Sequence, residues 1–335
     1  MTCLLCGGPV RKLLDLGEQP VSHDFLTEPG EQKRYPLSAG SCGGCGLAQL
    51  IDGPPEEALV PRFDWVRYVE PEMHLDEVAM SLKGRTVTGA TYKDDSLVER
   101  LKIRGFQKAE RADVVVARHV LEHPRDPKTY LSYLASMLNP AGLLLLEVPD
   151  SERGFRMGDV TTIWEEHTLY FTEATLRSSL ESAGWEVERI DRQRYTMEDC
   201  LMAHCRLGKP KPTQAKDDSL ENLADEIDPQ RHRWKKLLKG KKSAMLGAGH
   251  RGAAFLNFLG LSVDFVIDDH PSKAGLLLPG VQKPVRGSDA LKDVDVCLIS
   301  ANPDAEAAIT KKNDAFLKRG GRFLSIYPDS ALAPS

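Results

Sequence analysis

The chain has 335 residues, of which 41% are apolar and 28% are charged, and its formal net charge is −5. This length exceeds one ordinary hydrophobic core, so we expect two large units, or two large units and a small one. The small net charge gives no electrostatic attraction toward nucleic acid or an anionic membrane, so we expect a small-molecule substrate as partner, no nucleic acid and no membrane.

The apolar stretches and the start of the chain indicate a cytoplasmic protein. The longest apolar stretches, such as residues 142–148, are far shorter than the roughly 20 residues that a membrane span requires. Met1-Thr2-Cys3 leaves no room for a signal peptide. In a reducing compartment, the seven cysteines are expected to serve metal binding, catalysis or packing rather than disulfide bonds.

Residues 1–61 are expected to form a small metal-binding module. They are rich in glycine, proline and cysteine and show little helical periodicity, which indicates a unit held by something other than a core. The pairs Cys3-x-x-Cys6 and Cys42-x-x-Cys45 have the spacing that wraps a tetrahedral metal, and their soft thiolates favour zinc. An iron–sulfur cluster and four unrelated buried cysteines are the alternatives.

Residues 62–82 are expected to connect this module to the next unit. The stretch carries the aromatic residues Phe63, Trp65 and Tyr68. Its last part, residues 71–82, has the pattern of a helix.

Residues 83–207 are expected to form an α/β unit with a parallel sheet. Buried strands alternate here with amphipathic helices, and this alternation indicates crossover connections. Ser96 and Glu99 have the spacing of a capping box at the start of the first helix. The expected strands are residues 85–92, 113–117, 142–148 and 185–190, and the expected helices are residues 97–105, 127–138 and 172–183.

A linker and a second α/β unit complete the expected domain order. Residues 208–240 contain a charged helix, residues 219–238, which we expect to be solvated. Residues 241–335 repeat the α/β alternation, which predicts a smaller Rossmann-like domain. Its expected strands are residues 243–246, 263–267, 294–300 and 322–326, and its expected helices are residues 251–259 and 304–318.

A glycine motif opens the first helix of the C-terminal unit. Gly247, Gly249 and Gly252 follow an expected strand, and Asp268 ends the next strand about twenty residues later. Glycines in this context permit a tight turn and let a helix N-terminus receive a phosphate or another anion. A nucleotide-like ligand is one interpretation, and tight packing of the glycines alone is the other.

A second set of polar residues has the character of an acid–base site. Glu166 and His167 are followed closely by Tyr170, and a carboxylate beside an imidazole can fix the tautomer that a general base needs. A charged surface loop would look similar. His119 and the pair Glu122-His123 follow the strand at residues 113–117, at the carboxyl edge where open α/β sheets place ligands, so they are expected to line the site or to cap a helix.

Together these motifs resemble one family, the zinc-containing C-methyltransferases that act on nucleotide-linked deoxy-keto-sugars. The resemblance spans nearly the whole chain in three modules. It rests on the cysteine pairs with Leu14-Asp-Leu-Gly-Glu-Gln-Pro20 and Cys45-Gly-Leu-Ala-Gln-Leu50, on Arg118-His-Val-Leu-Glu-His123, Leu146-Glu-Val-Pro-Asp150 and Glu166-His-Thr-Leu-Tyr-Phe171, and on the glycine motif, Asp269-His-Pro-Ser-Lys273, Leu278-Pro-Gly280 and Gly320-Gly321.

The resemblance implies an α/β fold with a zinc module, a central methyltransferase-like Rossmann sheet and a C-terminal Rossmann-like domain. It implies S-adenosylmethionine as methyl donor, with His167 removing the proton next to a ketone and Glu166 as its partner. Tyr68 matches the family's connecting-segment tyrosine poorly. The residues expected to contact substrate are His119, His123, Tyr170, Lys93 and Lys273.

The region of the methyl donor departs from the family pattern. The strand at residues 86–92 runs into Lys93 without a glycine-rich turn, and only residues 93–112 separate it from the next long strand. This interval is too short for the additional elements of an adenosine pocket, so the central sheet is expected to be truncated. Either the donor pocket is rebuilt elsewhere, or the protein is a donor-independent epimerase or isomerase, or a non-catalytic binding protein or scaffold. Lys93, Asp94 and Asp95 would then contact substrate or cap the helix.

Overall fold

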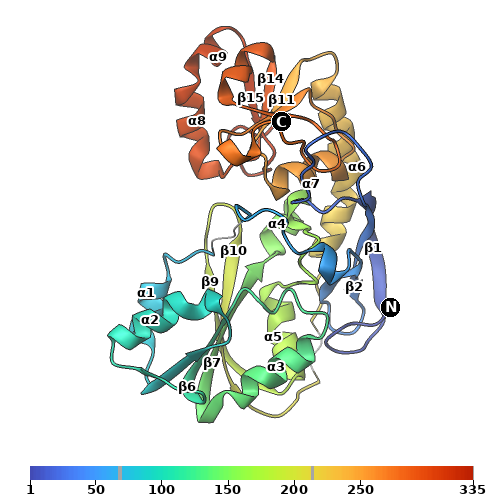
Figure 1. Ribbon diagram of the computed structural model, residues 1–335. Coiled ribbons are helices and arrows are strands. Elements are labelled where there is room, and N and C mark those ends of the chain that lie inside the picture. The colour runs from blue at the N-terminus through green and yellow to red at the C-terminus, as the bar shows by residue number, and fades with distance from the viewer. Residues whose placement is uncertain (67–69, 213–214, 335) are drawn as a thin grey trace.

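The computed structural model describes residues 1–66, 70–212 and 215–334. Its strands form three sheets, which belong to the N-terminal, central and C-terminal parts of the chain. Figure 1 shows the C-terminal sheet above the central sheet, with the N-terminal strands and helix α6 along one side. Within the described ranges, no helix combines the length and the apolar character needed to cross a membrane.

The N-terminal sheet is completed by a strand from the central part of the chain. The strand order is β1-β2-β3-β8, and neighbouring strands are antiparallel. Leu37 and Ala39 of β2 are buried in a cluster that also contains Leu223, so the module has an apolar core besides its cysteines, and the expectation that it lacks one was wrong. The strands are β1 (Val10–Gln19), β2 (Tyr35–Cys42), β3 (Ala48–Asp52) and β8 (Leu169–Tyr170).

The central sheet is mixed rather than purely parallel. Its order is β5-β4-β6-β7-β10-β9, in which the first four strands are parallel and β10 runs antiparallel to both of its neighbours. Strand β10 was not predicted as a separate element. The strands are β4 (Thr86–Gly89), β5 (Gln107–Lys108), β6 (Ala112–Arg118), β7 (Leu138–Asp150), β9 (Trp185–Gln193) and β10 (Asp199–Leu207).

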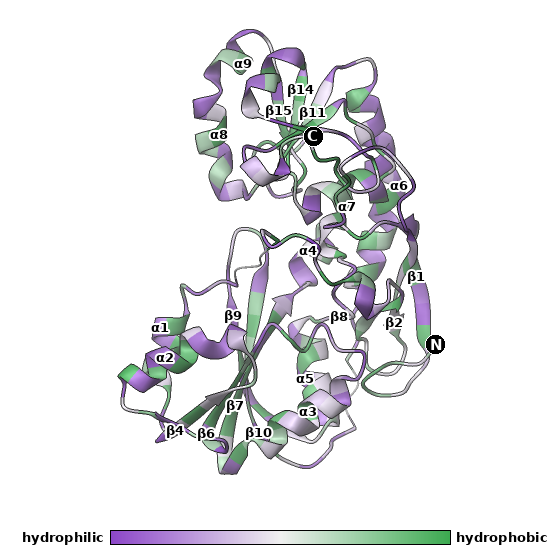
Figure 2. Cartoon of the chain, viewed as in Figure 1, coloured by the Kyte–Doolittle hydropathy of each residue, from purple (hydrophilic) through white to green (hydrophobic). Residues whose placement is uncertain are grey.

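Helices cover both faces of this sheet because successive side chains of a strand point to opposite faces. Val114 and Val116 of β6 pack with Leu97, whereas Val115 packs with Leu131 on the other face. Figure 2 shows the apolar colour concentrated on these strands. The helices are α1 (Leu75–Ser81), α2 (Asp95–Ile103), α3 (Pro127–Ser136), α4 (Glu152–Arg156) and α5 (Glu173–Ser182).

The turn after β4 differs from the expected one. The strand ends at Gly89 because the carboxylate of Asp94 accepts hydrogen bonds from the backbone N–H of Thr91 and from that of Arg118, both at 2.7 Å. The capping box is formed by Thr91 and Asp94, so the prediction of a box at Ser96 was wrong. Strand β4 therefore ends at Gly89 rather than at residue 92, where the apolar pattern placed its end.

Helix α6 (Ser219–Leu238) has the predicted bounds but not the predicted surroundings. Leu220, Leu223, Ile227 and Trp234 are buried and recur at helical spacing, so one face of the helix packs into the core. That cluster includes residues of both the N-terminal and C-terminal sheets. The interpretation as a solvated linker was wrong, because the charged residues occupy only the outer face.

The C-terminal sheet is parallel and has β11 at its centre, in the order β13-β12-β11-β14-β15. The predicted helix at residues 304–318 is divided at Asn313, whose backbone leaves the helical region. The strands are β11 (Ser243–Leu246), β12 (Phe265–Ile267), β13 (Val285–Arg286), β14 (Val296–Ile299) and β15 (Arg322–Ser325), and the helices are α7 (His250–Phe258), α8 (Glu306–Lys312) and α9 (Asp314–Lys318). Single stretches of 3-10 helix lie at Glu56–Ala58, Tyr92–Asp94, Val160–Thr162, Pro271–Lys273, Ser288–Asp293 and Pro303–Ala305.

Candidate zinc centre and active-site cavity

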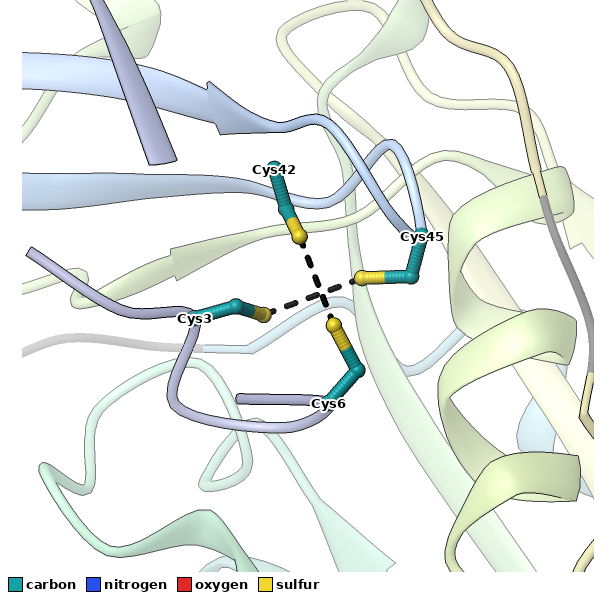
Figure 3. Close-up of side chains that lie close together, drawn as sticks. All are labelled: Cys3, Cys6, Cys42 and Cys45. Carbon is teal, nitrogen blue, oxygen red and sulfur yellow. Dashed lines mark hydrogen bonds between the residues drawn. The ribbon is translucent and has the colours of Figure 1, made fainter. Parts of the chain in front are cut away.

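The four N-terminal cysteines converge on one point, as predicted. Cys3 and Cys6 come from the first turn of the chain, and Cys42 and Cys45 come from the turn between β2 and β3 (Figure 3). The sulfur atoms of Cys3 and Cys45 are 3.7 Å apart, and those of Cys6 and Cys42 are 3.3 Å apart. Tetrahedral zinc with Zn–S bonds of about 2.3 Å places its sulfurs about 3.8 Å apart. The arrangement therefore fits zinc bound by four thiolates.

Backbone N–H groups donate hydrogen bonds to two of the cysteine sulfurs, and neighbouring glycines leave space for the cluster. The N–H of Gly8 donates to the sulfur of Cys6, and the N–H of Gly44 donates to that of Cys42, at 3.4 and 3.3 Å. A Cβ atom at Gly8 would lie 3.2 Å from the sulfur of Cys42, so a larger residue would crowd the cluster. Four protein ligands leave no open coordination position, which is typical of a structural rather than a catalytic zinc site.

A cavity of about 1350 Å³ lies between the central and C-terminal sheets. Lys93 follows β4 and His119 follows β6, so the carboxyl edge of the central sheet faces this cavity, as the strand order predicts. The opposite wall comes from the start of α7. Polar residues that line the cavity are Glu70, Glu72, Tyr92, Lys93, His119, Glu122, His123, Arg153, Glu166, His167, Arg194, Tyr195, Thr196, Glu198, Asp199, His250, Arg251, Asn302 and Asp304.

His167 lines this cavity and is almost fully buried, with 8% of its surface exposed. Its ring centroid lies 4.9 Å from that of His123 and 4.7 Å from that of Trp164. Burial, followed by the nearby positive charges, lowers the pKa of His167 well below its ordinary value. The imidazole is therefore neutral at pH 7, and one of its nitrogens carries a free electron pair.

Backbone hydrogen bonds on both sides fix the segment that carries His167. The N–H of Leu50 in β3 donates to the carbonyl of Thr168, and the N–H of Leu169 donates to the carbonyl of Glu122, each at 2.9 Å. The N-terminal sheet, which includes the zinc module, therefore positions His167 through the pairing of β3 with β8.

Glu166 contributes its backbone and its carboxylate to different contacts. Its carbonyl lies 2.9 Å from Nδ1 of His123 and accepts a hydrogen bond from that nitrogen. This bond fixes the tautomer of His123 with the proton on Nδ1, which leaves Nε2 as an acceptor. The carboxylate of Glu166 lies 3.8 Å from Nε2 of His23. Its role as the partner of His167 stays a prediction.

Lys93 and His119 meet at the carboxyl edge of the sheet. The ammonium of Lys93 donates to the carbonyl of His119 at 2.9 Å and pairs with Glu70 at 2.7 Å. His119 has a φ of 50°, a left-handed conformation that costs energy for a residue other than glycine and is frequent at functional sites. Lys93 thus faces the cavity, while the neighbouring Asp94 caps the turn.

A buried ionic network supports His119 from behind. Glu147 is paired with Arg118 and lies 2.9 Å from Nε2 of His74 and 3.7 Å from Nε2 of His119. Burial raises the pKa of Glu147, but the two imidazoles and Arg118 outweigh it and hold the pKa well below its ordinary value. The carboxylate therefore stays charged and orients the residues behind the cavity wall.

Two predicted substrate-contacting residues, Tyr170 and Lys273, are not among the described residues that line the cavity. Tyr170 is buried in the core, where its hydroxyl bonds to the backbone of Trp164. Lys273 pairs with Asp268 at 2.8 Å and lies over the ring of Trp65. Tyr68 lies outside the described residues.

Two glycines of the glycine motif are held in close backbone packing. Gly247 has a φ of 106°, and a Cβ atom on Gly252 would lie 2.8 Å from the carbonyl oxygen of Gly247, so both positions require glycine. Only Gly249 faces open space. The carboxylate of Asp268 accepts the N–H of Ala248 at 3.0 Å and pairs with Lys273, so internal contacts occupy it. A crevice of about 240 Å³ beside Gly247 is separate from the large cavity.

Several residues that line the cavity were not predicted from the sequence. Glu70 precedes the first helix, Tyr195 lies between β9 and β10, and His250 occupies the variable position after Gly249. Tyr195 donates to or accepts from Nδ1 of His74 at 2.5 Å. No local pattern marks these residues, because packing between distant elements brings them to the cavity.

Three family models match successive parts of the chain. They are described as "putative zinc binding domain" for residues 3–59, "methyltransferase domain" for residues 57–190 and "C-methyltransferase C-terminal domain" for residues 214–328. A curated relative, C-methyltransferase NovU of Streptomyces niveus, is 25% identical over 245 residues. The match covers 65% of this chain and 58% of the relative, so the chain spans less than two thirds of the relative's length.

Solved methyltransferase structures are also similar to part of the chain. An O-methyltransferase family protein from Burkholderia thailandensis has a TM-score of 0.30 and 12% identity, and the match covers 42% of this chain and 56% of that one. The glycopeptide N-methyltransferase MtfA, complexed with S-adenosyl-L-methionine, has a TM-score of 0.30 and 10% identity, and the match covers 44% of this chain and 100% of that one.

Proposed function

The chain belongs to the C-methyltransferases that carry a zinc-binding domain, and on this basis we propose that its cavity removes a proton next to a carbonyl group. His167 is the base in this proposal. The observation that carries it is the position of His167, a neutral and nearly buried imidazole on the wall of the large cavity. A buried neutral imidazole is able to accept a proton from a carbon acid held against it.

The proton transfer creates a negative charge on the substrate, and Lys93 supplies a positive charge in the same cavity. The C–H bond next to the carbonyl breaks, its proton moves to the imidazole of His167, and its electron pair moves onto the carbonyl oxygen as an enolate. Lys93 faces the same cavity, and its positive charge contributes to lowering the pKa of His167. An ammonium near the developing enolate stabilises the transition state, because the group is already oriented by Glu70 and the carbonyl of His119.

The size of the cavity favours a nucleotide-linked sugar or a similar substrate. Its volume of about 1350 Å³ exceeds that of ordinary small-molecule sites, which run from about 300 to 1,000 Å³. Arg153, Arg194 and Arg251 line it, where Asp199 pairs with the first two and Glu198 with the third. A phosphate of the substrate would replace these carboxylates as the partner of the guanidinium groups.

S-adenosylmethionine, when bound, supplies the electrophilic methyl group of the family reaction. The turn after β4 does not fit the usual donor site. Asp94 is fully buried there and occupies the N–H groups of Thr91 and Arg118, and a Cβ atom on Gly89 would lie 2.7 Å from that of Asp94. These groups are therefore not available to a ligand. This geometry supports the second candidate, a donor-independent epimerase or isomerase that uses the same base.

Mass spectrometry of a nucleotide-linked keto-sugar incubated with the protein in D₂O tests the proposal. Incorporation of one deuterium without S-adenosylmethionine supports proton abstraction, and a methylated product with S-adenosylmethionine identifies the methyltransferase. Deuterium exchange without methylation, together with no heat of S-adenosylmethionine binding in calorimetry, identifies the donor-independent enzyme. Neither exchange nor methylation with substrate bound would contradict both and leave a binding or scaffold protein.

A further inference from the structure

A second cluster of metal-binding residues lies in the cavity, apart from the four cysteines. Glu122, His123 and His167 each offer one ligand atom, and these atoms all lie within 4.8 Å of one another. The three residues come from two segments, the loop after β6 and the loop before β8, which are joined by the bond from Leu169 to Glu122. The proposed proton transfer uses only His167 of this set.

His123 is already oriented as a ligand. Its Nδ1 donates to the carbonyl of Glu166 at 2.9 Å, so Nε2 carries the free electron pair. Nε2 lies 3.8 Å from Oε1 of Glu122. Metal-binding histidines almost always donate their other N–H to a carbonyl or carboxylate in this way, because the bond fixes the tautomer and the direction of the ring.

Glu122 is a buried carboxylate with an unsatisfied oxygen. The residue is 2% exposed, and its Oε2 has no hydrogen-bond partner among the described residues. Its Oε1 lies 3.8 Å from a ring nitrogen of His119 and 3.8 Å from Nε2 of His123, beyond hydrogen-bond distance in both cases. An isolated carboxylate in this environment is costly, and a cation beside it would remove the cost.

We propose that Glu122, His123 and His167 bind a divalent transition-metal ion on the cavity wall. Two imidazole nitrogens and one carboxylate oxygen suit zinc, cobalt or iron rather than magnesium or calcium, which prefer oxygen ligands. Bonds of about 2.1 Å require the three side chains to close by about 1 Å, which small side-chain rotations provide. Three protein ligands leave positions open toward the cavity for water or for an oxygen of the substrate.

Metal binding at this cluster has a consequence for the base, and this consequence rests on the function proposed above. The metal and the proton compete for the same electron pair of His167. The ion-bound form therefore cannot remove the proton through His167, and the ion acts as an inhibitor of proton exchange. Release of the ion restores the base.

Cobalt titration of the full chain tests the site. The protein is first treated briefly with a chelator that leaves the four-cysteine zinc in place, as metal analysis verifies. We expect one further Co²⁺ to bind, with visible d–d bands and without the thiolate charge-transfer bands of a cysteine site. The variants Glu122→Gln and His123→Ala should weaken binding at least about tenfold. Glu122→Gln keeps the size of the side chain, and the melting temperature of each variant reports its folding.

His250→Ala is the matched control for these variants. His250 lines the same cavity, where it stacks on Trp164 at 4.6 Å, but it does not belong to the cluster. Its removal should leave Co²⁺ affinity unchanged. Absence of a further bound ion, or equal affinity in wild type, Glu122→Gln and His123→Ala, would overturn the proposed site.

Deuterium exchange into the keto-sugar, measured with and without Co²⁺, separates this inference from the function on which it partly rests. Suppression of exchange by Co²⁺ in proportion to site occupancy supports the competition. Full exchange at full occupancy overturns the competition but not the metal site. Failure of exchange in the metal-free protein refutes the proposed base, and the cobalt titration still decides the metal site.

Discussion

Glu147 shows at the scale of one residue how the cavity wall is stabilised. It is a fully buried carboxylate, and its charge is balanced by Arg118 and by two imidazoles, those of His74 and His119. Removing one member of a buried ionic network leaves the others unpaired, which costs more than the pair itself contributes. The sequence contains no local pattern for this network, because its members come from three segments that are distant in sequence.

Replacing Glu147 with glutamine should destabilise the protein by about 3 kcal/mol or more, because Arg118 then lacks its charged partner inside the protein. Chemical denaturation of the purified variant measures this loss. Glu99→Gln is a matched control, since Glu99 is exposed and pairs with Lys102 at the surface, and its change should stay within about 0.5 kcal/mol. Equal losses in the two variants would contradict the role of the network.

The same variant should also change the acid limb of the stability curve. The native pKa of Glu147 lies below its unfolded value, so the stabilisation is fully present above a pH of about 4.3, the unfolded value. It is lost as the pH falls below that value toward the native pKa, because protons then bind the unfolded chain preferentially. The melting temperature of Glu147→Gln should therefore fall less steeply with acidification than that of wild type. Parallel curves would show that the carboxylate is not stabilised in the native state.

The bounds of helices and strands could be predicted where the spacing of apolar residues in the sequence matches the residues that are buried in the fold. The bounds of α6 and of β11 follow from helical spacing and from a short apolar run, and the structure has both as expected. Strand β10 was missed, because a strand that is inserted antiparallel between β7 and the edge strand β9 departs from simple βα alternation. The surroundings of α6 were predicted wrongly, because the average charge of a helix does not reveal a narrow apolar face.

Leu223→Ala should test the corrected position of α6. Leu223 is fully buried against the cores of the N-terminal and C-terminal sheets, so its truncation should cost about 2 to 5 kcal/mol. Lys236→Ala changes an exposed position of the same helix and should cost little. Similar small effects of both substitutions in denaturant unfolding would restore the interpretation of a solvated helix.

Cys42→Ser should abolish stoichiometric zinc binding at the N-terminal cluster, because a neutral hydroxyl is a poor zinc ligand in place of a thiolate. Elemental analysis of the purified variant measures this loss. The pairing of β3 with β8 should loosen with it, which limited proteolysis near residue 168 would detect. Cys297→Ser provides the control, since Cys297 is buried in β14 away from the cluster, and it should retain zinc. Retention of zinc by Cys42→Ser would refute the four-cysteine site.

The whole molecule builds its candidate site between two sheets. The carboxyl-edge rule predicted that His119 and His123 line a site or cap a helix, and both line the cavity. Lys93, which was expected to contact substrate or to cap the helix, lines it as well. The rule gives no information on His250 or Tyr195, which the docking of the C-terminal sheet and the β9–β10 connection bring to the same space. Tyr170 was predicted from its nearness to His167 in sequence, but as a strand residue it points into the core.

The turn after β4 is closed by one buried residue. The missing glycine pattern indicated a changed donor edge, but sequence could not show what replaced it. The structure supplies a buried carboxylate, Asp94, that closes the turn from within. Lys93 belongs to the same turn, and both Lys93 and His167 line the large cavity.

Solvent-deuterium exchange catalysed by wild type and by His167→Ala tests the central role of His167 most directly. Substrate binding is measured in parallel by calorimetry, and His250→Ala serves as a control for loss of an imidazole from the same cavity. The account predicts a loss of exchange of about 10² to 10⁴-fold in His167→Ala with substrate still bound. Exchange at the wild-type rate in His167→Ala would contradict it.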